Sequence, residues 1–464
     1  MILHDALLAM LPEHVLLAGI VLLLVAEIAA LPGRAAAPIA LVAVVAAAGA
    51  GLWLSATGFT AAPFQGAYAI APFGSAAKAI LLVLAVPILL TAPGDLAGYR
   101  AYALVLSSLY GALLINGAES FTILFVGIEL MSLPLYALAV VSFKRDEGAE
   151  AALKYLVLGG AGSAMLLMGA ALVFGSGGSL SLAAFADALL SEDLLARAGV
   201  ALVVGALFVK AAIAPFHSWA PDVYEAASVP VTAYMAVVVK AAVLFAALHL
   251  FRAAALPVEL VDLVVLFALA SVVWGNLAAM RQASLRRTIA YSSIAHAGYL
   301  FYAFLDPGPG RPAAIAFYAI AYGLSNLLAF AAIPPAEDDA ARDRLEDLRG
   351  LFSRRPFAAI AIAIAMLSLA GVPPLPGFTA KFFLFNNAMI AGYTAYAVAG
   401  LVASYLGIYF YLRVIQILFA SPSEVAAGEP RGLRAAALVA TVLCLVGTLL
   451  LSVLPGWFLD RLAG

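Results

Sequence analysis

The chain has 464 residues, of which 66% are hydrophobic and only 11% are charged. Water-soluble domains carry about 45–50% apolar and about 25% charged residues, so this composition excludes an ordinary soluble globular protein. The net charge of −2 gives no reason to expect a nucleic-acid partner. The single cysteine, Cys444, excludes a disulfide framework, a thiolate zinc site and a cysteine-held iron–sulfur cluster made by this chain alone.

The N-terminal segment 1–5 lacks the basic region of a secretory signal peptide, so we expect the first apolar run to remain as a membrane span. A spanning helix needs about 20 mostly apolar residues to cross the hydrocarbon layer. We therefore predict an all-α membrane protein of about fourteen transmembrane helices. The predicted spans are 15–31, 36–57, 70–91, 99–117, 120–142, 151–174, 199–214, 229–251, 258–279, 287–305, 312–333, 357–388, 393–419 and 433–453.

Two of these spans carry features that interrupt a helix. The twelfth, 357–388, is too long for one straight helix and contains Gly-Val-Pro-Pro-Leu-Pro-Gly at 371–377. The seventh, 199–214, is short and runs into Ala214-Pro215. Proline removes a backbone donor, and irregular backbone at membrane depth is tolerated only inside protein or beside a water-filled cavity. We expect spans 7 and 12 to be discontinuous.

The two interruptions lie five spans apart, which predicts an internal repeat. A unit with an odd number of spans is inverted when it is repeated, and inverted repeats with broken helices are typical of ion-coupled transporters. The predicted parts are N-terminal helices 1–3 (residues 1–98), a first five-helix repeat (99–252), a second, inverted repeat (253–420) and helix 14 (421–464).

The positive charges predict the orientation of the chain. With the N-terminus on the periplasmic side, most of the loop Lys and Arg residues fall on the cytoplasmic side, as the positive-inside rule requires. The cytoplasmic set is Arg34, Arg100, Lys144, Arg145, Arg281, Arg286, Arg287, Arg342, Arg344, Arg349, Arg354, Arg355, Arg431 and Arg434. The opposite face holds Arg197, Arg252, Arg311 and Arg461.

A few ionisable side chains lie where a membrane helix should have none. Glu129, Lys210 and Lys240 each sit near the middle of an apolar run, and Lys381 follows the second interruption. A charge at the bilayer centre costs at least about 2.5–3.5 kcal/mol, and such residues usually mark an ion path. The alternative is a purely structural buried ion pair.

Other ionisable residues have simpler explanations. Three lie close to helix ends, where the charged group can reach the interface: Glu27, His249 and Arg413. Lys154 follows Glu150 by one helical turn, so an ordinary helix-surface pair is the alternative to a buried role. Lys78 lies some way into its span, and the sequence leaves its role undecided.

These residue types favour protons over metal cations. Burial disfavours a charged ammonium and a nearby carboxylate favours it, so a lysine held between the two effects can gain or lose a proton. Sodium needs several oxygen ligands, and the spans offer only Glu27 and Glu129 as clear carboxylates.

Histidine adds a second relay group, because its unperturbed pKa is near 6.5. His296 shares one helix face with Ser292 and Tyr299, and His217 follows the first interruption. The alternatives are hydrogen bonding between helices for His296 and a plain loop position for His217.

One motif resembles a known family. The segment 215–226, Pro-Phe-His-Ser-Trp-Ala-Pro-Asp-Val-Tyr-Glu-Ala, followed by Pro-Val-Thr-Ala-Tyr at 230–234, is similar to the signature of the antiporter-like membrane subunits of respiratory complex I. This form of the motif resembles the subunit N family of bacterial NADH-quinone oxidoreductase. Supporting stretches are 129–138, 152–155, 292–299 and 371–382.

The resemblance implies a fourteen-helix core with two inverted five-helix units. It implies a proton path through Glu129, Lys210, Lys240 and Lys381, the four residues that burial selects. Lys154 and His217 also match family positions, and His296 joins them on the supporting stretch.

The resemblance also implies a place in a larger assembly. The chain would hold no redox centre, and NADH, FMN, iron–sulfur clusters and quinone would bind partner subunits of the respiratory chain. Its partners would be the other membrane subunits and the peripheral redox arm, in the bacterial inner membrane. Two other hypotheses stay open at this point: a cation/proton antiporter, alone or in a complex, and a structural membrane subunit without transport.

Overall fold

The computed structural model describes residues 2–141, 146–251, 256–335, 343–422 and 432–463. Within these ranges the chain is almost entirely helical, with one two-stranded antiparallel sheet. Five residues from the orientation argument lie outside the described residues: Lys144, Arg145, Arg252, Arg342 and Arg431.

The contacts divide the chain into two compact units. Unit 1 comprises Met1–Ala212 and Val238–Val261, and unit 2 comprises Ile213–Val237 and Asp262–Gly464. These units do not have the boundaries of the predicted repeats, 99–252 and 253–420. The inverted repeat stays a prediction.

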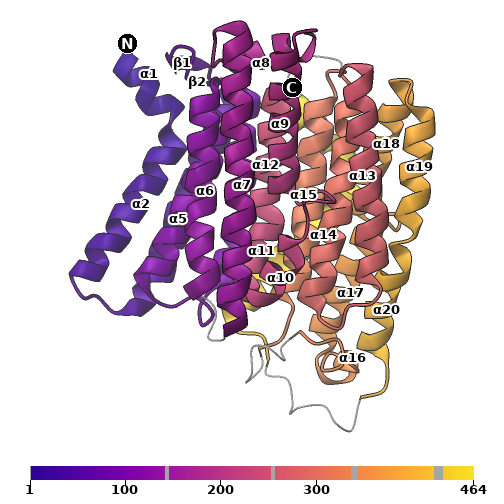
Figure 1. The fold of residues 1–464 in the computed structure, drawn as a ribbon. Helices are drawn as coiled ribbons and strands as arrows, with labels where there is room; N and C mark the ends of the chain where they lie inside the picture. The colour runs from indigo at the N-terminus through magenta and orange to yellow at the C-terminus, as the bar shows by residue number, and fades with distance from the viewer. Residues whose placement is uncertain (1, 142–145, 252–255, 336–342, 423–431, 464) are drawn as a thin grey trace. The chain divides into compact units, whose positions relative to one another are not determined.

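Unit 1 begins with the N-terminal helices and ends at Val261, near the start of the ninth predicted span. Its elements are α1 (Ile2–Ala9), α2 (Leu11–Ile28), η1 (Gly33–Ala35), α3 (Ala36–Ala56), β1 (Ala61–Phe64), β2 (Tyr68–Ile70), α4 (Pro72–Thr91), α5 (Gly98–Ile115), α6 (Phe121–Val141), α7 (Asp146–Gly177), α8 (Leu182–Leu189), α9 (Leu194–Ala211) and α12 (Lys240–Leu250). Figure 1 shows α2, α5, α6 and α7 side by side, with α1, β1 and β2 near one end of them.

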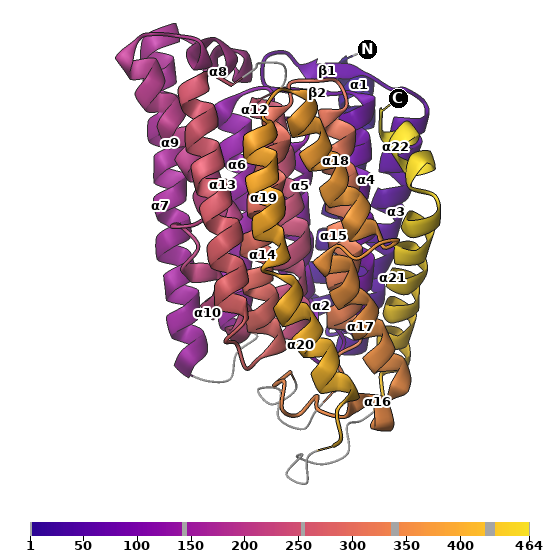
Figure 2. The same ribbon diagram turned by 90° about the vertical axis from the view of Figure 1, so that its right-hand side faces the viewer.

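Unit 2 holds the remaining elements. They are α10 (Trp219–Ala226), α11 (Val229–Tyr234), the larger part of α13 (Val258–Ala279), α14 (Leu285–Phe301), η3 (Tyr302–Leu305), α15 (Arg311–Ala331), α16 (Leu351–Arg354), α17 (Pro356–Ala370), α18 (Pro376–Ile390), α19 (Thr394–Tyr405), α20 (Ile408–Phe419), α21 (Ala435–Val453) and α22 (Pro455–Ala463). A π-helical turn, Met235–Val239, joins α11 to α12. Helices α17 and α21 pack against the buried α15, and Figure 2 shows all three.

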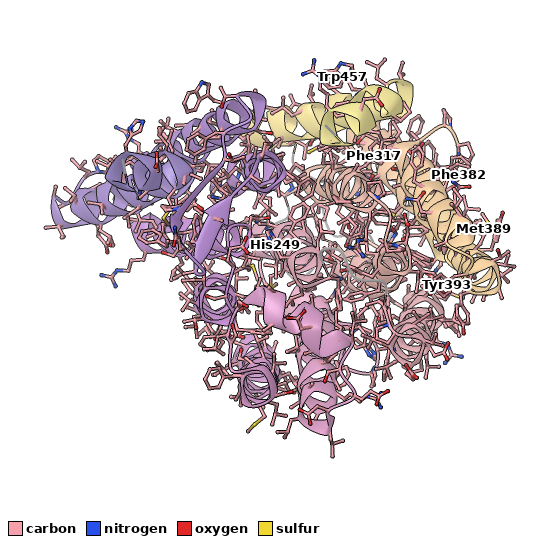
Figure 3. The ribbon with its side chains drawn as sticks, turned by 90° about the horizontal axis from the view of Figure 1, so that it is seen from above. His249, Phe317, Phe382, Met389, Tyr393 and Trp457 are labelled. Atoms are coloured by element: carbon pink, nitrogen blue, oxygen red, sulfur yellow. The ribbon has the colours of Figure 1, made fainter. Side chains whose placement is uncertain are left out.

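Apolar side chains cover the outer surface of unit 2. Phe382 and Met389 on α18 and Trp457 on α22 are exposed, and Figure 3 shows them pointing away from the helices that they belong to. A soluble protein does not leave this much apolar surface open to water, whereas a lipid bilayer accepts it.

Twelve helices in the described part of the chain are long and apolar enough to cross a membrane. They match twelve of the fourteen predicted spans. The other two predicted spans are also helical, but α14 is rich in polar residues and the span 357–388 is divided into α17 and α18. The structure therefore confirms the all-α membrane fold, and the count of fourteen stays a prediction.

Both predicted interruptions are present. Helix α9 ends at Ala211, Ala212 has a left-handed backbone with φ 58°, and α10 begins at Trp219. Helix α17 ends at Ala370, Gly371 has φ 85°, and α18 begins at Pro376. Each left-handed residue stops the helical hydrogen bonding, so carbonyl groups near both breaks are free to accept other donors.

Helices α2 and α9 begin earlier than the sequence suggested. Helix α2 starts at Leu11, so Glu13 lies inside it. Helix α9 starts at Leu194 because the Asp193 side chain accepts a hydrogen bond from the Leu195 N–H and caps the helix. Hydrogen bonds from the Ser176 hydroxyl and the first backbone N–H groups hold the pKa of Asp193 below its usual value. The predicted seventh span was thus too short at its start.

Glycines allow a close helix contact in unit 1, between α7 and α9. A Cβ built on Gly169 would lie 2.8 Å from the carbonyl oxygen of Gly199, and a Cβ on Gly199 would lie 2.9 Å from that of Gly169. Each glycine therefore makes room for the backbone of the other helix, as small residues do in membrane proteins.

We expect Gly199→Ala to destabilise the fold by about 1–3 kcal/mol, because the new methyl group would push α7 away from α9. Gly160→Ala is the matched control, since a Cβ there has no neighbour within 4 Å. The control should leave the free energy of unfolding unchanged or raise it by up to about 1 kcal/mol, because alanine has a higher helix propensity than glycine. Thermal unfolding of both variants in detergent measures the difference, and equal stabilities would contradict the close contact.

Candidate functional site

In unit 1, Glu129 on α6 and Lys210 on α9 form an ion pair. The Lys210 Nζ lies 3.4 Å from the Glu129 Oε1, and the side chains are 8% and 20% exposed, respectively. Lys210 also donates to the Ser132 hydroxyl at 3.4 Å. Ser163 on α7 donates to the same Glu129 oxygen. Three helices therefore position one carboxylate and one ammonium group.

The first interruption places Lys210 in the last turn of α9. The C-terminal end of a helix carries a partial negative charge, which stabilises a cation there. In unit 2, the chain beyond the break is fixed by a 2.7 Å hydrogen bond from the Ala214 N–H to the Ser271 hydroxyl on α13. The break therefore gives Lys210 a second favourable interaction besides Glu129.

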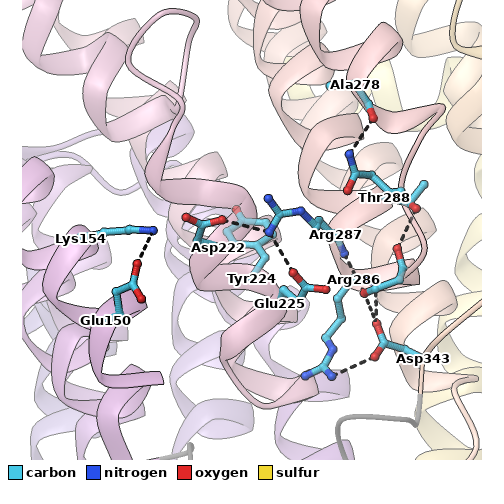
Figure 4. A network of polar contacts seen from close by, with 12 residues as sticks. Glu150, Lys154, Asp222, Tyr224, Glu225, Ala278, Arg286, Arg287, Thr288 and Asp343 are labelled. Carbon is cyan, nitrogen blue, oxygen red and sulfur yellow. Dashed lines mark hydrogen bonds and ion pairs between the residues drawn. The ribbon is translucent and has the colours of Figure 1, made fainter. Parts of the chain in front are cut away.

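Lys154 and Lys240 have different surroundings within unit 1. Lys154 pairs with Glu150 at 2.9 Å, and both side chains are largely exposed, at 44% and 70%; Figure 4 shows this pair. It is the helix-surface pair that the sequence allowed as an alternative. Lys240 is only 4% exposed and begins α12 directly after the π-helical turn. Such turns occur frequently at functional sites.

In unit 2, Lys381 on α18 turns back to the end of α17. Its Nζ donates to the carbonyl oxygens of Leu369 and Ala370 at 3.0 and 3.2 Å, and it lies 3.4 Å from the Ser404 hydroxyl. These carbonyls belong to the last turn of α17, which the second interruption leaves without helical partners. The break is thus the direct reason that a buried cation can be held there.

Lys381 is linked to His296 through an aromatic ring. Its Nζ lies 4.7 Å from the centre of the Tyr299 ring, and that ring meets the His296 ring edge-on at 5.3 Å. The His296 Nδ1 is 2.7 Å from the Tyr318 hydroxyl, and Nε2 is 3.1 Å from the Tyr411 hydroxyl. Both ring nitrogens can therefore exchange a proton with a neighbouring hydroxyl group.

The polar helix face predicted around His296 takes part in this network. Ser292 is 2.5 Å from the Tyr411 hydroxyl, and Tyr299 accepts a hydrogen bond from Asn276 at 3.1 Å. The structure thus brings His296 and Lys381 together within unit 2, as it brings Glu129 and Lys210 together within unit 1.

His217 lies between α9 and α10, in the first interruption. It is half-buried, and its ring centre lies 6.0 Å from that of Trp274 on α13. The structure thus places His217 in the first interruption, as the sequence predicted, and adds this contact with the Trp274 ring.

The acidic residues of the motif at 215–226 hold α10 in place, a role that the sequence did not predict. Arg287 on α14 pairs with Asp222 at 3.0 Å and with Glu225 at 2.8 Å. The preceding Arg286 pairs with the buried Asp343 at 2.9 Å and donates to the Ala227 carbonyl at 2.8 Å. Figure 4 shows this network. Two adjacent arginines therefore tie the chain after the first break to α14.

Two residues that the sequence assigned to helix ends have contacts that fit that position. Glu27 pairs with the exposed Arg100 at 2.7 Å, and Arg413 donates to the Met280 and Gln282 carbonyls at the end of α13. Lys78 is different, because it is fully buried and pairs with Glu13 at 2.6 Å. The sequence missed Glu13, because the first span was drawn from residue 15.

No group of three or more His, Cys, Asp or Glu side chains that could hold a metal ion occurs in the described part of the chain. The buried ionisable and polar groups described above are ammonium, carboxylate, imidazole and hydroxyl groups, which can exchange protons with one another.

These features define a class, a multi-pass membrane protein with interrupted helices and buried ionisable pairs. The chain belongs to the NADH:quinone oxidoreductase/Mrp antiporter transmembrane family, whose model matches residues 118–407. It is 36% identical over 422 residues to NADH-quinone oxidoreductase subunit N of Pelobacter propionicus, with 90% of each chain covered.

Two comparisons concern Thermus thermophilus. The chain is 44% identical over 366 residues to NADH-quinone oxidoreductase subunit 14, covering 79% of this chain and 80% of that one. It also matches a chain in the structure of respiratory complex I with bound aureothin, with a TM-score of 0.84 and 36% identity. That match covers 98% of this chain and 100% of the other. The resemblance inferred from the sequence motifs is confirmed.

Gly371 provides a test of the Lys381 site. A Cβ at this left-handed position would lie 3.2 Å from the Lys381 Cδ. Gly392 also has a left-handed backbone, with φ 95°, but a Cβ there has no neighbour within 4 Å. Backbone strain should lower the free energy of unfolding of both Gly→Ala variants by about 1–2 kcal/mol. Gly371→Ala should lower it further, because Lys381 must move. Thermal unfolding in detergent measures this, and equal losses would mean that Gly371 does not shape the site.

Proposed function

We propose that this chain is a proton-translocating membrane subunit of NADH-quinone oxidoreductase. Electrons pass from NADH to quinone in partner subunits, and the free energy of that transfer drives protons through this chain. The observation that carries the proposal is the Glu129–Lys210 pair. It is found in a chain whose relatives are named as subunits of this enzyme.

The pair is suited to binding and releasing a proton. The charged lysine is favoured while the carboxylate is charged and close, and it is disfavoured by burial once the carboxylate moves or is protonated. A shift in charge that starts at the quinone site would change this balance. Lys210 would then release or take up a proton, which is the elementary step of pumping.

The other buried groups extend the proposed path. It includes Lys240, His296 and Lys381, and the network of His296 with Tyr318 and Tyr411 supports a relay there. Lys154 and His217 are assigned to the path by resemblance to the family. Lys154 lies in an exposed pair, which fits a place where protons reach or leave the chain.

The proposed partner subunits and cellular location follow from the same family. The partners are other membrane subunits and a peripheral redox arm, which would hold FMN, the iron–sulfur clusters and the NADH and quinone sites. This chain has one cysteine and supplies no thiolate ligand set for a cluster. The location is the bacterial inner membrane, with the N-terminus on the periplasmic side.

Lys210→Ala should lower the number of protons pumped per NADH oxidised, because it removes the switchable group of the Glu129 pair. The measurement is acidification of inverted vesicles that contain the assembled enzyme, at matched rates of NADH oxidation. Arg197→Ala is the control, since it removes an exposed cation from the same helix α9. Unchanged pumping by Lys210→Ala would contradict the proposal.

The cation/proton antiporter hypothesis makes an opposite prediction. Vesicles that contain the purified chain alone would show sodium-dependent release of a proton gradient if it were an antiporter. We expect no such release, because the transmembrane helices supply few carboxylate ligands for sodium. Sodium-dependent release that is abolished by Lys210→Ala would favour antiport instead.

The orientation is testable by cysteine labelling in a Cys444→Ser background. His4 and Arg355 are both exposed. We expect His4→Cys to react with a membrane-impermeant maleimide added to intact cells, and Arg355→Cys to react only after the membrane is opened. This result follows from the positive-inside rule. The reverse pattern would place the N-terminus in the cytoplasm.

A further inference from the structure

A second buried ion pair in unit 1 joins α2 to α4. The Lys78 Nζ lies 2.6 Å from the Glu13 Oε1, and both side chains are 0% exposed. The Tyr68 hydroxyl on β2 donates to the same Glu13 oxygen at 2.8 Å and accepts a hydrogen bond from Lys78 at 2.5 Å. An ammonium, a carboxylate and a hydroxyl group are thus in mutual contact.

The surrounding backbone fixes the Tyr68 hydroxyl at this point. The Ala69 N–H donates to the Gly117 carbonyl at 2.9 Å, and the Glu119 N–H donates to the Ala67 carbonyl at 2.9 Å. Gly117 has no room for a side chain because the Tyr68 ring lies against it. Since segment 117–119 leads directly into α6, the backbone that holds Tyr68 also holds the start of the helix that carries Glu129.

The two ion pairs lie at similar depths along their helices. Lys78 follows the first residue of α4, Pro72, by six positions, and Glu129 follows the first residue of α6, Phe121, by eight. At 1.5 Å per residue these separations are about 9 and about 12 Å. The hydrogen bonds between 67–69 and 117–119 hold both helix starts at one end of unit 1.

Structural stabilisation alone explains this pair poorly. Burying two charges costs several kcal/mol each, and apolar side chains of similar volume often replace such a pair without loss. The pair is also incompletely satisfied, because the Glu13 Oε2 is buried and has no hydrogen-bond partner among the described residues. The same is true of the Ser75 hydroxyl, one turn before Lys78 on α4. Buried polar atoms of this kind are usually bonded to ordered water.

We propose that Glu13, Tyr68 and Lys78 form a further proton-binding site, through which unit 1 exchanges protons with the side of the membrane where α4 begins. This inference rests on the proposed function of the chain. It adds a site on the N-terminal helices to the path through Glu129 and Lys210.

The proton transfer is balanced within the three side chains. One N–H bond of the Lys78 ammonium breaks and one O–H bond forms on Glu13, which leaves a neutral amine and a carboxylic acid. By the indirect route, Tyr68 gives its proton to Glu13 and takes one from Lys78. The carboxylic acid then releases its proton to water, and the amine takes up the next one.

Tyr68 serves as a neutral relay in this scheme. Burial and the Glu13 carboxylate raise the pKa of the Tyr68 phenol well above its usual value of 10.0, so the hydroxyl keeps its proton between transfers. Tyr110 on α5 is a further titratable group that interacts with the Glu13 charge.

The test compares protons pumped per NADH in vesicles that contain the assembled enzyme. Glu13→Gln should lower the ratio to the value of Lys210→Ala, and the combination should be no lower, because both groups serve one path. Glu27→Gln is the matched control at the other end of α2, where the carboxylate is partly exposed and paired with Arg100. The control should pump as the unmodified enzyme does.

Two further variants separate proton transfer from folding. Glu13→Gln/Lys78→Met leaves no single buried charge, so it should unfold near the temperature of the unmodified enzyme and still pump poorly. Tyr68→Phe keeps the ion pair and should slow pumping. Full pumping by the double variant would overturn the inference and leave a structural pair. If Lys210→Ala pumps fewer protons per NADH and Glu13→Gln pumps the normal number, the inference is also overturned. If Lys210→Ala itself pumps the normal number, the proposed function is contradicted.

Discussion

A lysine inside a membrane protein must have a specific partner, because hydrocarbon cannot solvate its charge. The Glu129–Lys210 contact meets this requirement with a carboxylate at 3.4 Å, supported by the hydroxyl groups of Ser132 and Ser163. Because Glu129 can itself be protonated, the charge state of Lys210 depends on that of Glu129. The charge on Lys210 is favoured only while Glu129 keeps its own charge nearby. The capacity to move a proton therefore follows from the same contact that makes the buried charge tolerable.

The interrupted helices solve the same problem in a different way. Lys381 has no carboxylate among the contacts described above, and it donates instead to two carbonyl groups at the end of α17. Gly371 creates these free carbonyls by ending the helix in a left-handed turn. In α9, the corresponding turn at Ala212 puts Lys210 at the negative end of the helix dipole. A backbone defect that would be costly in lipid thus becomes the binding site for a cation.

Most of the fold could be predicted from the sequence, because membrane helices follow directly from the length and hydropathy of each run. Glu129, Lys210 and Lys381 could be chosen because each sits in or beside an apolar run. The Glu13–Lys78 pair could not be predicted, because the groups that contact Glu13, Tyr68 and Lys78, lie on β2 and α4, 55 or more residues further along the chain. The contacts of Arg287 with α10 were missed for a similar reason, since nothing in an acidic motif identifies its partner.

Proton transfer through the Glu129–Lys210 pair is tested most directly by the proton yield of the Glu129→Gln/Lys210→Ala double variant in the assembled enzyme. This variant removes both charges of the pair, so no single buried charge remains to unfold the chain. The measurement is protons pumped per NADH oxidised in sealed vesicles, with quinone reduction followed in parallel. We expect an assembled enzyme that still reduces quinone and pumps fewer protons. An undiminished proton yield would show that the pair is structural and that this chain does not move protons through it.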